Sequence, residues 1–194
     1  MSDPATHEDQ PEELPNPPAD PEQVARTILL RRLDAAPRTR AQLADTLRSR
    51  NVPEDVAERV LDRFVEVGLI NDRMFAQMWV ESRTRTRNLS TRALRRELQI
   101  KGVADDLIAE ALEMVTAEDE VAGARRIVAR KVSSVTGLPR TTQYRRLAGA
   151  LARKGYSAAV AATVVREALA AAEHEAAELE EAERAEPLDS NDLP

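Results

Sequence analysis

Arginine side chains are the most distinctive chemical groups in this sequence. Between Arg83 and Lys101, seven basic residues accompany a single acid, Glu97, and nine basic residues occur from Arg125 to Lys154 without any acid. Guanidinium groups bind phosphates and carboxylates through paired, charge-assisted hydrogen bonds. The two stretches therefore predict contacts with nucleic-acid phosphates or with an acidic protein surface.

The central arginines lie on a predicted helix face of their own. Arg92, Arg95 and Arg96 do not share the face of Leu94 and Leu98, so their charges point outward. Because the local sequence does not compensate their mutual repulsion, we favour a binding role over simple solvation, with pairing to acids of the first repeat as the alternative. The predicted contact residues are Arg85, Arg87, Arg92, Arg95, Arg96, Arg145, Arg146 and Arg153.

Residues suited to catalysis or metal binding are scarce. The sequence has no Cys, and its two His residues, His7 and His174, lie in the flanks. Residues 149–155 lack the Gly-Lys-Ser/Thr order of a phosphate-binding loop. Asp105 and Asp106 begin a predicted helix, where carboxylates favour the helix dipole, so a catalytic pair is the weaker interpretation. We predict a protein that binds a partner without catalysing a reaction and without a metal or cofactor.

The net charge of −6 averages three unlike segments. Residues 1–21 contain six acids and no base, and residues 172–194 contain nine acids and one base, Arg184. The remaining body has 27 bases against 19 acids, which gives a net charge of +8. We predict a disordered acidic arm over residues 1–21 and an acidic tail over residues 173–194, with a basic body between them.

Composition favours helix throughout the body. Ala, Leu, Glu and Arg dominate the sequence, whereas aromatic residues make up only 3%. No apolar stretch approaches the roughly 20 residues that span a bilayer, and no basic segment followed by an apolar one opens the chain. The sequence therefore predicts an all-α cytoplasmic protein with no membrane contact, and we expect it to be a monomer.

One helical pattern occurs three times. Pairs of Leu four residues apart recur at intervals of 51 and 53 residues, each on the inner face of a middle helix. These pairs are Leu43 and Leu47, Leu94 and Leu98, and Leu147 and Leu151. A residue type that tolerates positive φ ends each middle helix, at Asn51, Gly102 and Gly155. The pattern predicts three tandem three-helix repeats, over residues 22–70, 71–116 and 117–172, stacked into an elongated curved rod.

The same periodicity assigns inward positions to the first helices. A helix is expected over residues 22–33, with Val24, Leu29 and Leu30 on its inner face. A second is expected over residues 72–85, with Phe75, Met78 and Trp79 on its inner face. Pro53 is expected at the first position of the third helix. The last helix is expected to continue into solvent and to fray by Pro187.

The central stretch resembles a known family. Gly68-Leu-Ile-Asn-Asp-Arg-Met-Phe-Ala76, then Trp79-Val80, Arg83 and Arg95-Arg-Glu-Leu-Gln-Ile-Lys-Gly-Val103, are similar to the signature of the RecX recombination regulators. The likeness extends over residues 24–170 and is weaker in the third repeat. The family usually has a Gly between its first and middle helices, where this chain has Asn88-Leu-Ser90; Asn tolerates positive φ and Ser can cap a helix.

The resemblance implies a function as well as a fold. A RecX-like chain binds the RecA nucleoprotein filament in its helical groove and blocks extension or promotes disassembly. Strand exchange, ATP hydrolysis and the coprotease activity of RecA then fall, and with them DNA recombination, DNA repair and the SOS response. A general DNA-binding helical scaffold, held by DNA phosphates, is the alternative. Direct major-groove reading is the weaker idea, because the predicted third helices are acidic or neutral.

Overall fold

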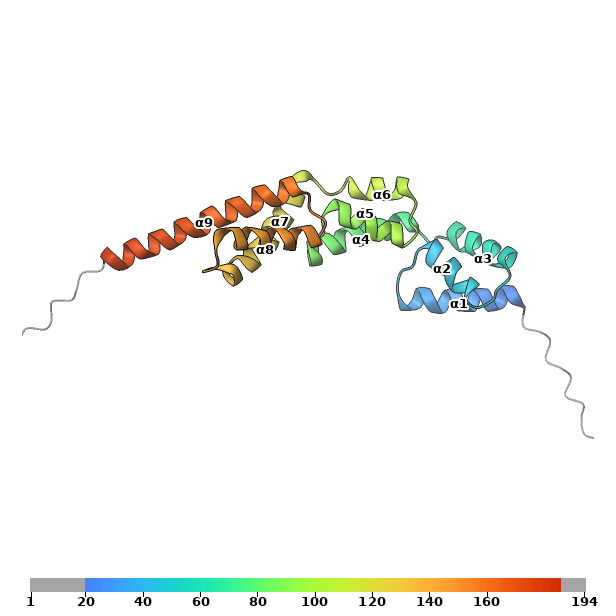
Figure 1. The fold of residues 1–194 in the computed structure, drawn as a ribbon. Coiled ribbons are helices and arrows are strands. Elements are labelled where there is room, and N and C mark those ends of the chain that lie inside the picture. Colours follow the sequence, from blue (N-terminus) through green and yellow to red (C-terminus); the bar gives the residue numbers. More distant parts are fainter. Residues whose placement is uncertain (1–19, 186–194) are drawn as a thin grey trace, which may run out of the picture.

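The computed structural model describes residues 20–185, and this part of the chain is helical without any strand. Figure 1 shows its helices in three consecutive groups that form a gently arched row. The helices are α1 (Pro21–Ala35), α2 (Arg40–Arg48), α3 (Glu54–Glu66), α4 (Asp72–Arg87), α5 (Thr91–Ile100), α6 (Asp105–Leu112), α7 (Ala117–Val132), the short 3-10 helix η1 (Ser133–Val135), α8 (Arg140–Arg153) and α9 (Ala158–Ala185). The predicted all-α fold of three tandem three-helix repeats is confirmed.

Each group of three helices encloses its own apolar core. The middle-helix pair Leu94 and Leu98 is fully buried between α4 and α6, and the corresponding pairs are buried in the other two groups. Among the described residues, the three clusters of buried side chains are separate from one another. Apolar packing therefore holds each unit together internally, whereas polar contacts join one unit to the next.

The middle helices meet end to end. The Thr39 hydroxyl, at the start of α2, donates a hydrogen bond of 2.6 Å to the carbonyl oxygen of Lys101, just past the end of α5. In the same way, the Ser90 amide before α5 donates to the carbonyl oxygen of Lys154 after α8, at 3.2 Å. These contacts satisfy carbonyl groups that a helix end leaves free, and they place opposite ends of the helix dipoles beside each other.

Glycine permits this close approach at two positions. Gly102 and Gly155 have φ values of +75° and +89°, as expected for residues that end the middle helices. A Cβ on Gly155 would lie 2.8 Å from the Cβ of Ala93, and a Cβ on Gly102 would overlap that of Ala41. Asn51 adopts φ +57° at the equivalent position of the first unit, which has no preceding unit in the described chain to approach it.

Asn88 links the second unit to the third. It adopts φ +47°, and Ser90 caps α5 by accepting a hydrogen bond from the amide of Ala93, so both expectations for this turn are confirmed. The buried hydroxyl of Tyr156 donates to the Asn88 carbonyl at 3.0 Å, and Arg126 Nε donates to the Asn88 side-chain oxygen at 2.8 Å. The turn is therefore fixed by side chains from the third unit.

Several predicted positions are wrong. Val24, Leu30 and Met78 are exposed, and Ala25 lies in the first core with Leu29. A three-helix unit is so small that only a narrow stripe of each helix meets the core, and larger apolar residues beside that stripe remain in solvent. Pro53 caps α3, which begins at Glu54 and not at the proline.

The ends of the chain fall partly outside the described residues. The predicted arm up to residue 19 and the expected fraying at Pro187 both lie there. Helix α9 itself is continuous as far as Ala185, through the predicted start of the acidic tail, and its last turns project beyond the body (Figure 1). No described helix has both the length and the apolarity to cross a membrane.

Candidate partner-binding groove

Two adjoining hollows gather basic side chains from α5, α7 and α8. The first has a volume of about 560 Å³ and is lined by Arg92, Arg96 and Arg153, among others. The second has a volume of about 400 Å³ and is lined by Lys131, Arg145, Arg146 and again Arg153. Because Arg153 lines both hollows, we treat them as one surface feature and call it the basic groove.

End-to-end packing of α5 against α8 creates the first hollow, whereas the second lies within the third unit. Arg92 lies at the start of α5 with Arg96 one turn further along, and Arg153 is the last residue of α8. The hydrogen bond from Ser90 to Lys154 joins those two helix ends directly. Side chains about 60 residues apart in the sequence therefore become neighbours because of the junction between the second and third units.

The arginines of the groove carry unpaired charges. Within residues 20–185, no carboxylate forms an ion pair with Arg92, Arg96, Arg145, Arg146 or Arg153, and all five are exposed. Acids of the first unit do not reach them: Glu58 and Asp62 pair with Arg40 instead. The alternative of compensation by the first repeat is thus not observed among the described residues.

Other basic residues of the third unit are already engaged. Arg125 pairs with Glu167 at 3.0 Å, and Arg140 pairs with Glu173, so acids of α9 neutralise part of the predicted positive stretch. Arg126 is bound to Asn88. Unlike these three residues, Arg145, Arg146 and Arg153 of the basic groove keep their charge open to a partner.

Glu97 is the one acid that lines the first hollow, and its carboxylate is occupied. Its Oε2 accepts a hydrogen bond of 2.8 Å from Trp79 Nε1 and lies 3.5 Å from Arg83 Nε. A carboxylate held in this way is less available to neutralise Arg92 and Arg96 on the neighbouring helix face. The groove therefore offers a net positive surface to a partner.

Trp79 organises a second set of basic residues beside the core. Its ring stacks with that of Phe75 at a centroid distance of 5.7 Å, and both Arg83 Cζ and Lys101 Nζ lie 4.0 Å from its centroid. Desolvation lowers the pKa of Lys101, and the positive charge of Arg83 lowers it further. Trp79 is half-buried and already contacts two cations, so we assign this cluster to the packing of the second unit.

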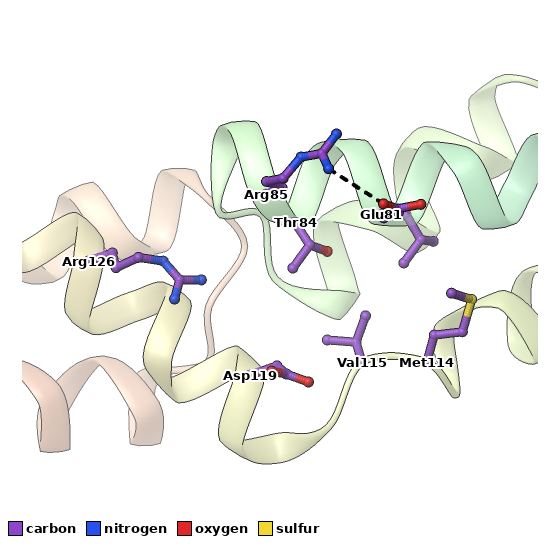
Figure 2. Close-up of a pocket in the computed structure, with 8 residues that line it drawn as sticks. Glu81, Thr84, Arg85, Met114, Val115, Asp119 and Arg126 are labelled. Carbon is purple, nitrogen blue, oxygen red and sulfur yellow. Dashed lines mark ion pairs between the residues drawn. The ribbon is translucent and has the colours of Figure 1, made fainter.

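Three predicted contact residues lie outside the basic groove. Arg85 lines a separate pocket of about 530 Å³ between α4 and the start of α7, where it pairs with Glu81 at 3.5 Å (Figure 2). Arg87, at the end of α4, and Arg95, on α5, are exposed but line neither hollow of the groove. The structure thus brings together the other five predicted arginines and separates these three.

The pocket around Arg85 has a mixed character. Val80, Met114 and Val115 supply apolar surface, and charged side chains of both signs surround it (Figure 2). The Thr84 hydroxyl is buried and has no hydrogen-bond partner in the described part of the chain. Because the charges there oppose one another, this pocket is a weaker candidate than the basic groove for an anionic partner.

Sequence reasoning missed two residues of the groove. Lys131 lies in the acid-free basic stretch from Arg125 to Lys154, but it is not among the predicted contact residues. Ile100 lies inside the arginine-lined hollow and is 78% exposed. No group of three or more His, Cys, Asp or Glu side chains in the described residues is placed to hold a metal ion.

Comparisons with known proteins agree on one family. Residues 25–64 match the model of the first three-helix domain of RecX, and residues 71–112 match that of the second. A regulatory protein RecX of Streptomyces lividans is 57% identical over 79% of this chain and 81% of its own length. Similar proteins of the same description occur in Thermobifida fusca, at 49% identity over 76% of this chain and 80% of the relative, and in Mycobacterium tuberculosis, at 44% over 77% and 88%.

Solved structures support the fold. The crystal structure of RecX from Lactobacillus salivarius superposes with a TM-score of 0.70 and 23% identity, over 77% of this chain and 97% of that one. A second crystal structure of a regulatory protein RecX gives a TM-score of 0.68 at 23% identity, over 75% of this chain and 72% of that one. At this level of identity, the likeness concerns the arrangement of the helices.

Proposed function

Because this chain belongs to the RecX family of regulatory proteins, we propose that it is a negative regulator of RecA that binds the RecA–DNA filament. Binding inhibits the recombinase, ATPase and coprotease activities of RecA, and so restrains DNA recombination, DNA repair and the SOS response. The chain acts as a monomer in the cytoplasm, by binding alone, without a catalytic step, metal or cofactor.

The observation that carries this proposal is the open basic groove. Its five arginines form no ion pair among the described residues, although acids are plentiful elsewhere in the chain. Unpaired, exposed guanidinium groups repel one another, and a partner rich in carboxylates or phosphates relieves that repulsion. A nucleoprotein filament supplies both kinds of group.

The shape of the chain supports binding to an extended partner. Three units joined end to end spread a contact surface along a row, as other helical-repeat proteins do when they bind long ligands. The groove lies at the junction of the second and third units, so both must keep their relative position for the arginines to act together. We therefore propose that the rod lies along the filament and that α5 and α8 face it.

The test combines a groove variant with a charge-matched control. The triple variant Arg92→Glu, Arg96→Glu and Arg153→Glu is compared with Arg31→Glu, Arg32→Glu and Arg50→Glu, which alter exposed arginines of the first unit that form no ion pair within residues 20–185. Both triples change the net charge equally. The groove variant is expected to need about tenfold or more protein for the same inhibition of the DNA-dependent RecA ATPase.

The control triple separates the groove from overall charge. It is expected to inhibit RecA at nearly the wild-type concentration, and both variants are expected to keep the wild-type circular dichroism because all six side chains are exposed. Equal loss in the two triples would attribute binding to net charge. Full inhibition by the groove triple would move the contact to another surface.

A general DNA-binding scaffold is the second candidate. The unpaired arginines of the groove could hold DNA phosphates without any protein partner, and such binding would weaken steeply with salt. Exposed Asp105 and Asp106 at the start of α6 oppose insertion of that helix into a major groove. Tight, salt-sensitive binding to bare DNA, combined with no added affinity for RecA-coated DNA, would favour this candidate over the first.

A further inference from the structure

An apolar side chain stands in line with the groove arginines on α5. Arg92, Arg96 and Ile100 are four residues apart in turn, so they share one face of the helix. All three line the first hollow of the basic groove. Ile100 is 78% exposed, and the core of the second unit is completed by Leu94 and Leu98 on the opposite side of the helix.

Packing within the chain does not explain why an apolar side chain occupies position 100. Ile100 lies outside the buried cluster of the second unit and outside the partly buried residues that pack against it. It is also the last residue of α5, where a cation would interact favourably with the helix dipole and Ile gains nothing. An exposed β-branched side chain that shares a hollow with the unpaired Arg92, Arg96 and Arg153 combines apolar and charged surface, as protein interfaces do.

We propose that this face of α5 docks onto an acidic protein surface that has an apolar recess for Ile100, with carboxylates opposite Arg92 and Arg96. The inference rests on the proposed function and refines it, since it assigns the contact to the protein of the filament and not to its DNA. Charge complementarity identifies the partner as acidic, and the exposed Ile identifies it as protein.

A nucleic-acid backbone would not use this combination. Phosphate contacts are made by cationic and polar groups, through charge and hydrogen bonding. An aliphatic side chain beside a phosphate desolvates the charge without compensation, whereas a recess lined by apolar protein side chains gains from burying it. On this face of α5 the arginine row ends in Ile100, the last residue of the helix, where a third cation would suit a phosphate chain.

The test uses Ile100→Gln in the full-length protein. Gln preserves the helix and the neighbouring charges and replaces the aliphatic side chain with a neutral polar one. Leu179→Gln is the matched control, because Leu179 is also exposed, at 62%, and lies on the projecting part of α9. Affinity is measured by fluorescence anisotropy for RecA-coated single-stranded DNA and for the same DNA bare, at one salt concentration.

The expected result is specific to the coated DNA. Ile100→Gln weakens binding to RecA-coated DNA about tenfold, as loss of a central interface side chain does, and leaves binding to bare DNA unchanged. Leu179→Gln leaves both affinities unchanged. An equal loss on coated and bare DNA would assign this face to nucleic acid and overturn the inference.

Two further outcomes also contradict the inference and can be told apart. If Ile100→Gln binds coated DNA normally while Arg92→Glu with Arg96→Glu binds weakly, the contact is purely electrostatic and Ile100 is no anchor, although the proposed function stands. If the wild-type protein does not bind RecA-coated DNA at all, the proposed function fails together with the docking face.

Discussion

Replacing Gly155 with Ala would place a methyl group inside the junction between α5 and α8. The new Cβ would lie 2.5 Å from Ser90 Oγ, 2.8 Å from Ala93 Cβ and 3.1 Å from the Ala93 amide nitrogen. Such overlap in a packed site costs about 1–3 kcal/mol. The backbone adds a second cost, since an L-residue at a φ of +89° is strained by about 1–2 kcal/mol.

Gly137→Ala is the matched control for that variant. Gly137 lies in the same unit with a φ of +82°, and no atom outside its own chain neighbours lies within 4 Å of its ideal Cβ. It therefore carries the backbone strain of about 1–2 kcal/mol without the overlap. The extra loss in Gly155→Ala, about 1–3 kcal/mol, measures how closely the two units approach.

Two readouts test the reasoning. The free energy of unfolding comes from urea titration followed by circular dichroism. Hydrogen exchange of the Ser90 amide reports the junction itself, because this group donates to the Lys154 carbonyl. Gly155→Ala is expected to accelerate that exchange and Gly137→Ala to leave it unchanged. Equal stability and equal Ser90 exchange in the two variants would refute the end-to-end packing of α5 and α8.

Two further predictions concern the same junctions. Thr39→Ala removes both a helix cap and the hydrogen bond to Lys101, whereas Thr116→Ala removes only an exposed cap. Urea unfolding should therefore show Thr39→Ala to be less stable than Thr116→Ala by about 1 kcal/mol. Equal losses of unfolding free energy in the two variants would contradict the hydrogen bond between the units. Burial raises the pKa of Tyr156 from its usual 10.0 to about 12, so its phenolate is disfavoured in the folded state. The contribution of Tyr156 to the free energy of unfolding is therefore fully present below pH 10 and is lost as the pH rises toward 12, and Tyr156→Phe lacks this loss. The difference in unfolding free energy between wild type and Tyr156→Phe should shrink between pH 8 and pH 11. A constant difference would contradict the burial of the hydroxyl.

The fold followed from local pattern to a large degree. Leu pairs at helical spacing and the residues Asn51, Gly102 and Gly155 are read directly from the sequence, because periodicity and positive φ are local properties. Exposure was less predictable. Met78 has the right spacing for the inner face of α4 but lies beside the narrow stripe that meets the core.

The site was predictable only in part, for a different reason. Arg92 and Arg96 were identified from the local excess of positive charge. Their proximity to Arg153 depends on the junction of α5 with α8, and no local signal in the sequence reports which helix ends will meet. Lys101 ends the central basic stretch of the sequence, and only the structure shows its ammonium over the ring of Trp79.

The most direct test of the proposed function is the DNA-dependent ATPase of RecA, measured during titration with the wild-type chain. We predict that ATP hydrolysis falls as the protein is added and that strand exchange in the same mixture falls with it. The charge-reversed groove variant is expected to inhibit much less at equal concentration. Unchanged hydrolysis and strand exchange at stoichiometric excess of the wild-type protein would contradict the account.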